Sequence, residues 1–320
     1  MLRYGYKLMS EEHAPKVLIG NACLAEDAGF DFVAISDHLQ PWLDEQGHAP
    51  FAWPVLGAIA VATERVGIMT AVTCPFLRYH PAIVAQAAAT TAIMCGDRFT
   101  LGLGAGEALN ERAVGRGWPS VATRHEMLRE AVSIIEGLWS GERTSYEGRH
   151  LTLENARLYD LPDVPPPIAI AAGGPEAAQL AGERADALVA TEPKAGLVEA
   201  YRGHGGDGPR YAELSLCWAA DEASGLATVR ERFRWCRLGW KVLPELAEPA
   251  AFDAATQLLE PADFRDTVPC GPDLQRYVEA VRRYRDAGFD HVILTQVGPD
   301  QAGFLRFWEH ELAPALRAMS

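Results

Sequence analysis

The sequence predicts an α/β protein in which eight strand–helix pairs close into a (β/α)8 barrel, the TIM-barrel architecture. Short apolar, β-branched segments alternate with helix-like segments along the whole 320-residue chain, with no internal repeat and no linker. Such barrels contain about 250 residues before insertions, which suits this length. Polar residues capable of chemistry follow many of the strands, as a ring of loops around one site requires. An open, doubly wound sheet is the alternative architecture.

The expected elements are defined by apolar runs and by the residues that end them. Residues 1–320 are expected to form one barrel domain with two insertions, near 144–167, where a small hairpin is expected, and near 232–268. Strands are expected at 4–8, 31–36, 66–72, 99–103, 168–172, 187–190, 213–220 and 291–297. Helices are expected at 12–28, 54–63, 81–95, 124–139, 175–183, 272–287 and 304–317.

Composition excludes several classes of protein. The chain is 48% hydrophobic and 22% charged, which is ample for a sizeable core. Its net charge of −14 argues against a nucleic-acid partner, and no apolar run reaches membrane-spanning length. The six cysteines show no CxxC spacing and the N-terminus has no signal core, so we expect a reducing, cytoplasmic location. None of the nine histidines pairs as HxH or HExxH, and no metal is implied.

One strand end carries a distinctive group of side chains. The apolar run 31–35 is followed by Asp37 and His38, and Pro41 then ends any regular structure before Trp42. Asp37, His38 and Trp42 should therefore lie just past the carboxyl end of a strand, the edge at which parallel α/β proteins bind ligands. The alternative is that Asp37 caps the next segment and His38 is an ordinary loop histidine.

Two glycine-rich strand ends are suited to a cofactor. Gly104, Ala105 and Gly106 follow the fourth strand and would let the backbone approach a flat ligand closely. They do not form a GxGxxG fingerprint, which argues against NAD binding in the Rossmann manner. Gly173 and Gly174 lie between a strand and a helix start, where free amides suit a phosphate. Tight turns are the alternative interpretation of both segments.

His38 and Glu107 supply the pair of groups that proton transfer needs. They follow different strands, so a barrel would bring them to the same mouth. A histidine that titrates near neutrality, beside a carboxylic acid, can move protons to and from a reacting centre. Trp42 would wall this site or stabilise a protonated imidazole through its ring face.

Seven segments together carry a resemblance to a known family. They are GYK (5–7), SDHLQPW (36–42), GHAPF (47–51), RYHP (78–81), GAGEALNE (104–111), LWSG (138–141) and AAGGP (171–175). The chain resembles the luciferase-like oxidoreductase superfamily and, more narrowly, its F420-dependent glucose-6-phosphate dehydrogenase branch. The resemblance covers most of the chain and is weaker through the later insertion. It implies a luciferase-like TIM barrel, commonly a homodimer, that holds the deazaflavin coenzyme F420 across the carboxyl ends of the strands.

The resemblance also implies roles for individual residues. His38 matches the proposed general base on the substrate hydroxyl, and Glu107 matches the proposed acid near the deazaflavin ring. Glu11 and Trp42 match other catalytic members of the active site. The remaining matches are residues that contact the cofactor: Asp37, Ala71, Val72, Asn110 and, near its phosphate, Gly173 and Gly174. The resemblance also implies that the peptide bond between Ala71 and Val72 is cis.

The expected substrate is a small organic molecule other than glucose 6-phosphate. Thr191, Lys194 and Arg265 match parts of the family's substrate-phosphate site. The family's further Lys-His pair is not evident, and Glu245 and Glu248 make that stretch acidic. A buried phosphate dianion needs several aligned cations. We therefore expect hydride transfer to F420 from another alcohol, or from F420 to a carbonyl or an activated alkene.

Two alternative functions stay open. One is an FMN-dependent monooxygenase on the same fold, with FMN in place of F420. The other is a barrel that binds a cofactor or ligand without catalysis. The combination of His38, Trp42 and Glu107 favours the deazaflavin enzyme, because it contains both proton-transfer candidates.

Overall fold

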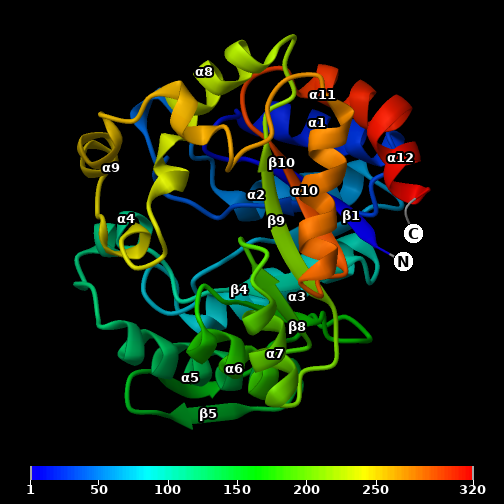
Figure 1. Ribbon diagram of the computed structural model, residues 1–320. Helices are drawn as coiled ribbons and strands as arrows, with labels where there is room; N and C mark the ends of the chain where they lie inside the picture. Colours follow the sequence, from blue (N-terminus) through cyan, green and yellow to red (C-terminus); the bar gives the residue numbers. More distant parts are fainter. Residues whose placement is uncertain (1, 319–320) are drawn as a thin grey trace.

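The computed structural model describes residues 2–318, in which eight parallel strands form a closed barrel with helices around it (Figure 1). The strands pair in the order β1-β10-β9-β8-β7-β4-β3-β2, and β1 closes the barrel between β10 and β2. The predicted TIM barrel is therefore confirmed. The barrel strands are β1 (Arg3–Leu8), β2 (Phe32–Ile35), β3 (Gly67–Thr70), β4 (Phe99–Leu103), β7 (Ile168–Ala171), β8 (Ala187–Ala190), β9 (Arg210–Leu216) and β10 (His291–Gln296).

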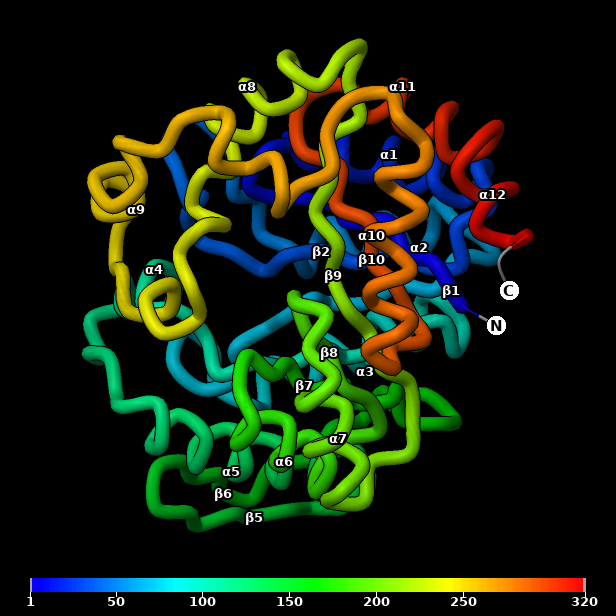
Figure 2. The backbone as a smooth tube through the Cα atoms, in the orientation of Figure 1, coloured from blue at the N-terminus to red at the C-terminus, as the bar shows by residue number. Residues whose placement is uncertain are grey.

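Helices connect the strands and cover the outside of the barrel, as the smooth chain trace shows (Figure 2). Within residues 2–318, no helix combines the length and the hydropathy that crossing a membrane requires. The helices are α1 (Pro15–Asp27), α2 (Ala52–Ala62), α3 (Pro81–Cys95), α4 (Ala108–Glu111), α5 (Val121–Trp139), α6 (Pro175–Arg184), α7 (Ala195–Gly203), α8 (Glu222–Arg232), α9 (Pro249–Thr256), α10 (Leu274–Asp286), α11 (Gln301–Phe307) and α12 (Ala313–Arg317).

Several element boundaries differ from the prediction by a few residues, and α7 and α8 lie where no helix was expected. Two of the boundary differences have a clear physical reason. The first helix was expected from residue 12, but α1 begins at Pro15, whose fixed φ and missing N–H suit the first helical position. Glu12 and His13 therefore lie in a turn. The strand expected at 213–220 is β9, which ends at Leu216. The backbone of the next residue, Cys217, forms a parallel β-bridge with the backbone of Cys270 instead of continuing in the barrel, and both thiols are free.

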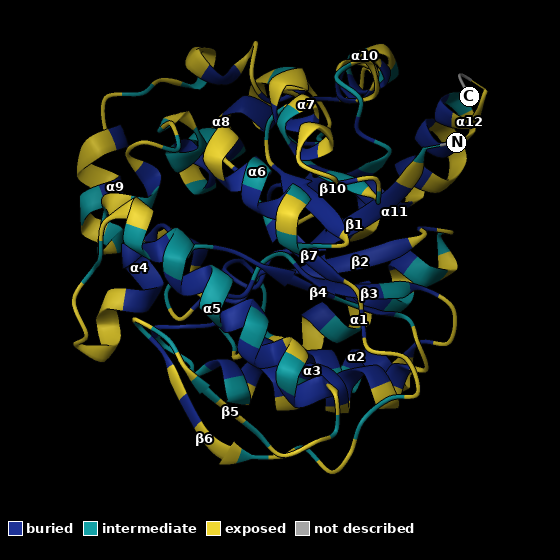
Figure 3. Cartoon of the chain, turned by 90° about the horizontal axis from the view of Figure 1, so that it is seen from below, coloured by how far each residue is buried: buried dark blue, intermediate teal, exposed yellow. Residues whose placement is uncertain are grey.

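The barrel interior is packed with side chains. Phe32, Met69 and Ile293 are buried together inside it. The ring of Phe32 lies over Gly5, where a Cβ atom would come within 2.2 Å of that ring, so only glycine fits there. The strands are mostly buried, as the dark blue barrel in Figure 3 shows. A ligand site must therefore lie at the ends of the strands rather than inside the barrel.

Two segments extend beyond the strand–helix pattern. Residues 144–167 contain the antiparallel strands β5 (Thr144–Glu147) and β6 (Thr152–Ala156), which form the expected hairpin. Residues 232–268 form α9 and several short 3-10 helices. Leu243 and Phe252 of this second segment pack against residues of the loops that follow β2 and β4. The segment therefore covers one side of the barrel mouth.

Candidate active site

The loops at the carboxyl ends of the strands carry the predicted catalytic side chains. Glu11 follows β1, His38 and Trp42 follow β2, and Glu107 precedes α4 in the loop after β4. Glu11, His38 and Trp42 are buried, and Glu107 is half-buried. Because the strands are parallel and form one barrel, these side chains belong to the same mouth.

The imidazole of His38 is oriented by two hydrogen-bond acceptors. Its Nδ1 lies 3.3 Å from Glu11 Oε1 and 3.3 Å from the carbonyl oxygen of Gln40. Since both neighbours accept hydrogen bonds, Nδ1 carries the ring proton and Nε2 keeps its lone pair. His38 is therefore held in the tautomer that can take a proton at Nε2.

Glu11 is a buried carboxylate that its neighbours keep ionised. Burial acts to raise its pKa, but the nearby His38 and Lys7 and the hydrogen bond from Ser36 outweigh it and hold the pKa of Glu11 below its ordinary value. The Ser36 hydroxyl donates to Glu11 Oε2 at 2.7 Å. Glu11 therefore provides a fixed negative charge beside the histidine.

Trp42 forms a wall beside His38 and is supported by the covering segment. The two ring centroids lie 5.0 Å apart with an interplanar angle of 59°. Trp42 stacks on Trp235 at 4.4 Å and meets Phe252 edge-on at 5.2 Å. Both supporting rings come from residues 232–268, so this segment fixes the aromatic wall of the mouth.

Asp37 is enclosed by hydrogen-bond donors. Its Oδ1 accepts from Arg78 at 3.0 Å and from the Tyr79 hydroxyl at 2.9 Å. Its Oδ2 accepts from the Thr73 hydroxyl at 2.8 Å. The Asp37 side chain is 0% exposed and that of Arg78 is 8% exposed, so the ion pair is buried. Asp37 thus ties the loop after β2 to the loop after β3, and its contact with a cofactor stays a prediction.

Asn110 joins the loops after β2 and β4 and keeps one donor unused. Its Oδ1 accepts hydrogen bonds from the backbone N–H groups of Leu39 and Gln40, at 2.8 and 3.2 Å. Its Nδ2 is buried without a partner. A buried donor left unpaired costs about 1–3 kcal/mol, so this amide is suited to a ligand that accepts a hydrogen bond.

The carboxylate of Glu107 is available for chemistry. Among the residues that the structure describes, no hydrogen bond or ion pair reaches its carboxylate oxygens, although its backbone carbonyl accepts from Asn110 and Glu111. Glu107 lies at the start of α4 with its side chain half-buried. A carboxyl group that is not committed to a structural partner can gain or lose a proton without breaking the fold.

The backbone at the centre of the mouth suits a flat molecule. The Ala71–Val72 peptide bond is cis, as the resemblance implies, and the Ala71 carbonyl accepts from Lys7 Nζ at 2.9 Å. A Cβ atom at Gly104 would lie 2.6 Å from Val72 Cγ2. Gly106 has a φ of +76°, which glycine adopts without strain. Close packing against the Val72 side chain accounts for Gly104, and the positive φ accounts for Gly106. The contact of residues 104–106 with a cofactor stays a prediction.

Gly173 and Gly174 lie at the start of α6, a helix of 10 residues. A Cβ atom at Gly174 would meet no atom within 4 Å, so this backbone is open. A Cβ atom at Gly173 would lie 3.1 Å from the Trp240 ring, which covers that glycine. Trp240 Nε1 also donates to Thr191 Oγ1 at 2.7 Å. The first amides of α6 are suited to an anion, with Trp240 beside them.

The two predicted substrate cations are engaged by nearby carboxylates. Lys194 Nζ lies 2.6 Å from Glu192 Oε2, and the lysine side chain is 53% exposed. Arg265 Nε lies 3.4 Å from Glu222 Oε1, and the arginine side chain is 57% exposed. Lys194 and Arg265 therefore contact two different carboxylates, Glu192 and Glu222. Their part in substrate binding stays a prediction.

Three aromatic residues that shape the mouth were missed at the level of sequence: Trp235, Trp240 and Phe252. All three lie in residues 232–268, for which the sequence shows no regular strand–helix pattern. The signal that was available is the presence of two tryptophans, Trp235 and Trp240, close together in an insertion of irregular pattern.

Comparison with known proteins identifies the class. A family model described as luciferase-like monooxygenase matches residues 4–291, and the chain therefore belongs to the luciferase-like family. A solved F420-dependent secondary alcohol dehydrogenase, in complex with an F420-acetone adduct, superimposes with a TM-score of 0.91. It is 29% identical, and the alignment covers 99% of each chain. An F420-dependent tetrahydromethanopterin reductase from Methanopyrus kandleri shares the fold, with a TM-score of 0.78 at 19% identity over 98% of this chain and 99% of that one.

More specific relatives lie within this family. An F420-dependent glucose-6-phosphate dehydrogenase of Microbacterium testaceum is 40% identical over 99% of this chain and 98% of its own. A protein of the same name from Beutenbergia cavernae is 37% identical with the same coverage. The resemblance inferred from the seven sequence segments is therefore confirmed, and the prediction of an F420-dependent oxidoreductase agrees with these names.

The buried Asp37 network generates a prediction for stability. Asp37→Asn replaces one carboxylate oxygen by an amide donor that must face Arg78, Tyr79 or Thr73, each of which is itself a donor. Breaking a buried ion pair costs about 3–5 kcal/mol, so we expect the free energy of unfolding in urea to fall by that amount. The control is Asp44→Asn, an exposed site in the same loop, where a change within about 0.5 kcal/mol is expected. Equal stability of the two variants would contradict the structural role of Asp37.

Proposed function

We propose that this chain is an oxidoreductase that depends on coenzyme F420 and transfers a hydride between the deazaflavin and a small organic substrate. The observation that carries the proposal is the pair of hydrogen-bond acceptors that face Nδ1 of His38. Its Nδ1 faces the acceptors Glu11 and Gln40, which leaves Nε2 ready to take a proton. The names of relatives that are 40% and 37% identical over 99% of the chain support the choice of cofactor.

The geometry of the mouth fits this cofactor. The unpartnered Nδ2 of Asn110 offers a hydrogen-bond donor to the polar edge of a ring. The open amides at Gly174 suit a phosphate at the start of α6. When bound, the deazaflavin supplies a carbon that accepts or releases a hydride.

We assign the proton transfers to two residues. His38 Nε2 takes the proton of the substrate hydroxyl while the carbon atom that bears this hydroxyl loses a hydride. The ionised Glu11 stabilises the imidazolium that results. In the reverse direction the imidazolium returns this proton to the carbonyl oxygen. We assign the proton transfer on the cofactor side of the mouth to the Glu107 carboxyl group, and Trp42 helps to exclude water from His38.

The surroundings of His38 favour an uncharged substrate over a sugar phosphate. The ring beside His38 is Trp42, which is backed by Trp235 and Phe252. Arg234 of the covering segment is already paired with Glu45 and Asp253. Lys194 is already paired with Glu192. A small alcohol or its carbonyl product fits this setting, which agrees with the similarity to a structure named as an F420-dependent secondary alcohol dehydrogenase. We therefore propose interconversion of a small alcohol and its carbonyl compound, with glucose 6-phosphate disfavoured.

Binding and turnover test the proposal. Titration of the purified protein, followed by fluorescence, should show F420 binding at least about tenfold tighter than FMN, because the site is assigned to the deazaflavin. With F420 present, 2-propanol should reduce it faster than glucose 6-phosphate does, as measured from the deazaflavin absorbance. Tighter binding of FMN would move the chain to the monooxygenase alternative. Faster turnover of glucose 6-phosphate would agree with the assignment of F420 as the cofactor but would contradict the proposed substrate.

A variant of His38 tests its role as the base. His38→Ala should lower kcat for alcohol oxidation by about 10²–10⁴-fold, the usual contribution of a positioned base, while the Kd for F420 changes little. His310→Ala is the control, since His310 is 67% exposed on the outside of the barrel. If His38→Ala turns over at the rate of the control, another group must act as the base.

We further propose that the protein works as a homodimer in the cytoplasm, where its six free cysteines stay reduced. Helices α2 and α3 pack together and contain no charged residue, although the chain carries a net charge of −14. Their exposed side chains include Val61 at 70%, Ile83 at 55% and Ile93 at 47%. An uncharged outer face of this kind is typical of a subunit interface.

Sedimentation equilibrium tests the dimer. The native chain should sediment at twice its mass of 34.8 kDa, and Ile83→Asp should shift the population toward the monomer, because it places a charge in the interface. Val164→Asp is the control at a site that is 65% exposed, outside α2 and α3, and should leave the mass unchanged. A native protein that sediments as one chain rejects the proposal.

A further inference from the structure

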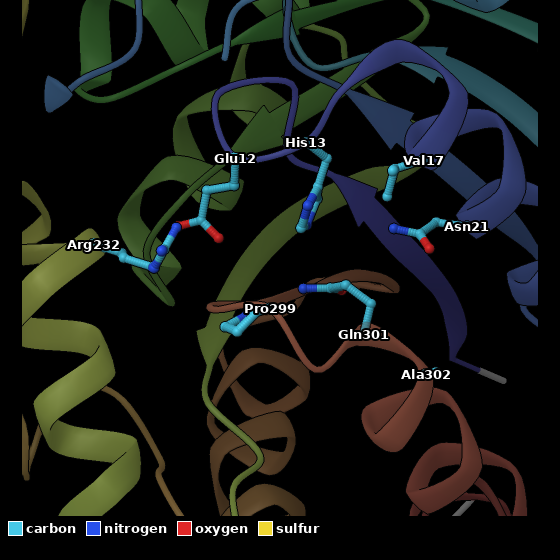
Figure 4. Close-up of a pocket in the computed structure, with 8 residues that line it drawn as sticks. All are labelled: Glu12, His13, Val17, Asn21, Arg232, Pro299, Gln301 and Ala302. Carbon is cyan, nitrogen blue, oxygen red and sulfur yellow. The ribbon is translucent and has the colours of Figure 1, made fainter. Parts of the chain in front are cut away.

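A second pocket lies outside the barrel mouth, beside the turn between β1 and α1. Its volume is about 240 Å³, and it is lined by this turn, by α1, by the end of α8 and by the start of α11 (Figure 4). Glu12, His13, Asn21 and Arg232 form its polar part. None of them belongs to the residues assigned to catalysis, so the pocket calls for an explanation of its own.

Three polar atoms in this pocket are buried and have no partner. They are Glu12 Oε1, His13 Nε2 and Asn21 Nδ2. The residues Glu12 and Asn21 are only 6% and 7% exposed. Figure 4 shows these three side chains directed into the same space. Each unpaired buried group costs about 1–3 kcal/mol, so three of them in one cavity indicate a ligand that completes their hydrogen bonds.

The three groups can all donate, which selects the chemistry of the ligand. The Asn21 amide donates as it stands. Burial lowers the pKa of His13 to about 4, so its ring is neutral near pH 7 and can carry its proton on Nε2. Burial raises the pKa of Glu12 to about 7, so its carboxyl can remain protonated and donate from Oε1. A ligand rich in acceptor oxygens meets all three.

Arg232 adds a positive charge at the edge of the same pocket. Its Nε lies 3.8 Å from Glu231 Oε1 of the same helix, a long ion-pair distance that leaves guanidinium donors for a ligand. Gln301 is not available, because its Nε2 donates to the carbonyls of Gln296 and Gly298 and its Oε1 accepts from Tyr6. A cation with several neutral donors is the arrangement that binds a carboxylate.

We propose that this pocket binds a small monocarboxylate, with its oxygens on Arg232, Asn21, His13 and Glu12. Its short apolar tail packs on the apolar part of the wall, which consists of Val17, Pro299 and Ala302. No covalent bond changes. When Glu12 is ionised before binding, it takes up one proton as the carboxylate binds, because two anions cannot share the cavity. The proposal does not rest on the assignment of F420.

The proton uptake is governed by the groups that face Glu12. Glu11 on the same turn raises its pKa, and Arg232 from α8 lowers it. The backbone N–H of Gly298, after β10, donates to Glu12 Oε2 at 3.1 Å, and Gln46 from the loop after β2 also lowers the pKa. Burial outweighs these contributions. Carboxylate affinity should therefore be highest below pH 7 and should fall as the pH rises through 7 and Glu12 ionises.

Sodium butyrate is the probe for this site, with butyramide and butylammonium as matched neutral and cationic analogues. Isothermal titration of the full-length protein at pH 6.0 should give a Kd for butyrate at least about tenfold lower than for either analogue. At pH 8.5 the Kd for butyrate should rise by about thirtyfold, as expected when binding needs a protonated carboxyl group with a pKa of about 7. Equal binding of butyramide, preferred binding of butylammonium, or no heat from butyrate at pH 6.0 would overturn the proposal.

Three variants locate the site. Arg232→Gln should weaken butyrate binding by about tenfold or more, whereas Arg306→Gln, an exposed arginine on α11, should leave it unchanged. Glu12→Gln keeps a neutral donor in place, so butyrate should bind equally well at pH 6.0 and pH 8.5. Thermal unfolding verifies that each variant is folded. A Glu12→Gln protein that keeps the pH dependence, or an Arg306→Gln protein that loses binding, shows that the carboxylate binds elsewhere.

Discussion

The mouth of the barrel depends on one buried carboxylate, that of Glu11. Its Oε1 faces His38 Nδ1 at 3.3 Å, its Oε2 accepts from Ser36 at 2.7 Å, and its backbone carbonyl accepts from the N–H of His48 at 3.0 Å. One residue at the end of β1 thus fixes the tautomer of the histidine and holds the loop that follows β2. Because its pKa is lowered in the folded protein, Glu11 stabilises the fold above the ordinary carboxyl pKa. That stabilisation is lost as the pH falls through its folded pKa.

The charge that helps to keep Glu11 ionised comes from inside the barrel. The ammonium of Lys7 lies 2.8 Å from Glu213 Oε2 and 2.9 Å from the Ala71 carbonyl. Lys7 is 7% exposed, so its charge is poorly screened by water and lowers the pKa of Glu11. Glu213 balances this charge from β9. The barrel therefore supports the histidine electrostatically as well as sterically, with Lys7 linking the interior to the mouth.

Sequence reasoning recovered the strands because a parallel strand buried on both faces is a continuous apolar run, as in β2 and β8. It also located Glu11, His38, Trp42 and Glu107, since polar residues that end such runs must lie at the mouth. It could not place the rings of Trp235 and Phe252 behind Trp42, because that contact joins segments far apart in the chain and follows no period. It likewise could not show that Lys194 is neutralised by Glu192, since that depends on the orientation of side chains in a loop.

Two adjacent glutamates show how the surroundings divide similar residues between two tasks. Glu11 and Glu12 are both buried, and burial acts to raise the pKa of each. Glu11 faces His38 and Lys7, which outweigh burial and keep it ionised for the mouth. For Glu12, burial outweighs the hydrogen bond from Gly298 and the charge of Arg232, while the neighbouring Glu11 adds to the rise, and its pKa rises to about 7. The turn that starts α1 at Pro15 places these neighbouring side chains in different environments, one in the active site and one in the second pocket. A helix from residue 12 would have held Glu12 in regular backbone, so the late start of α1 is what makes the second pocket possible.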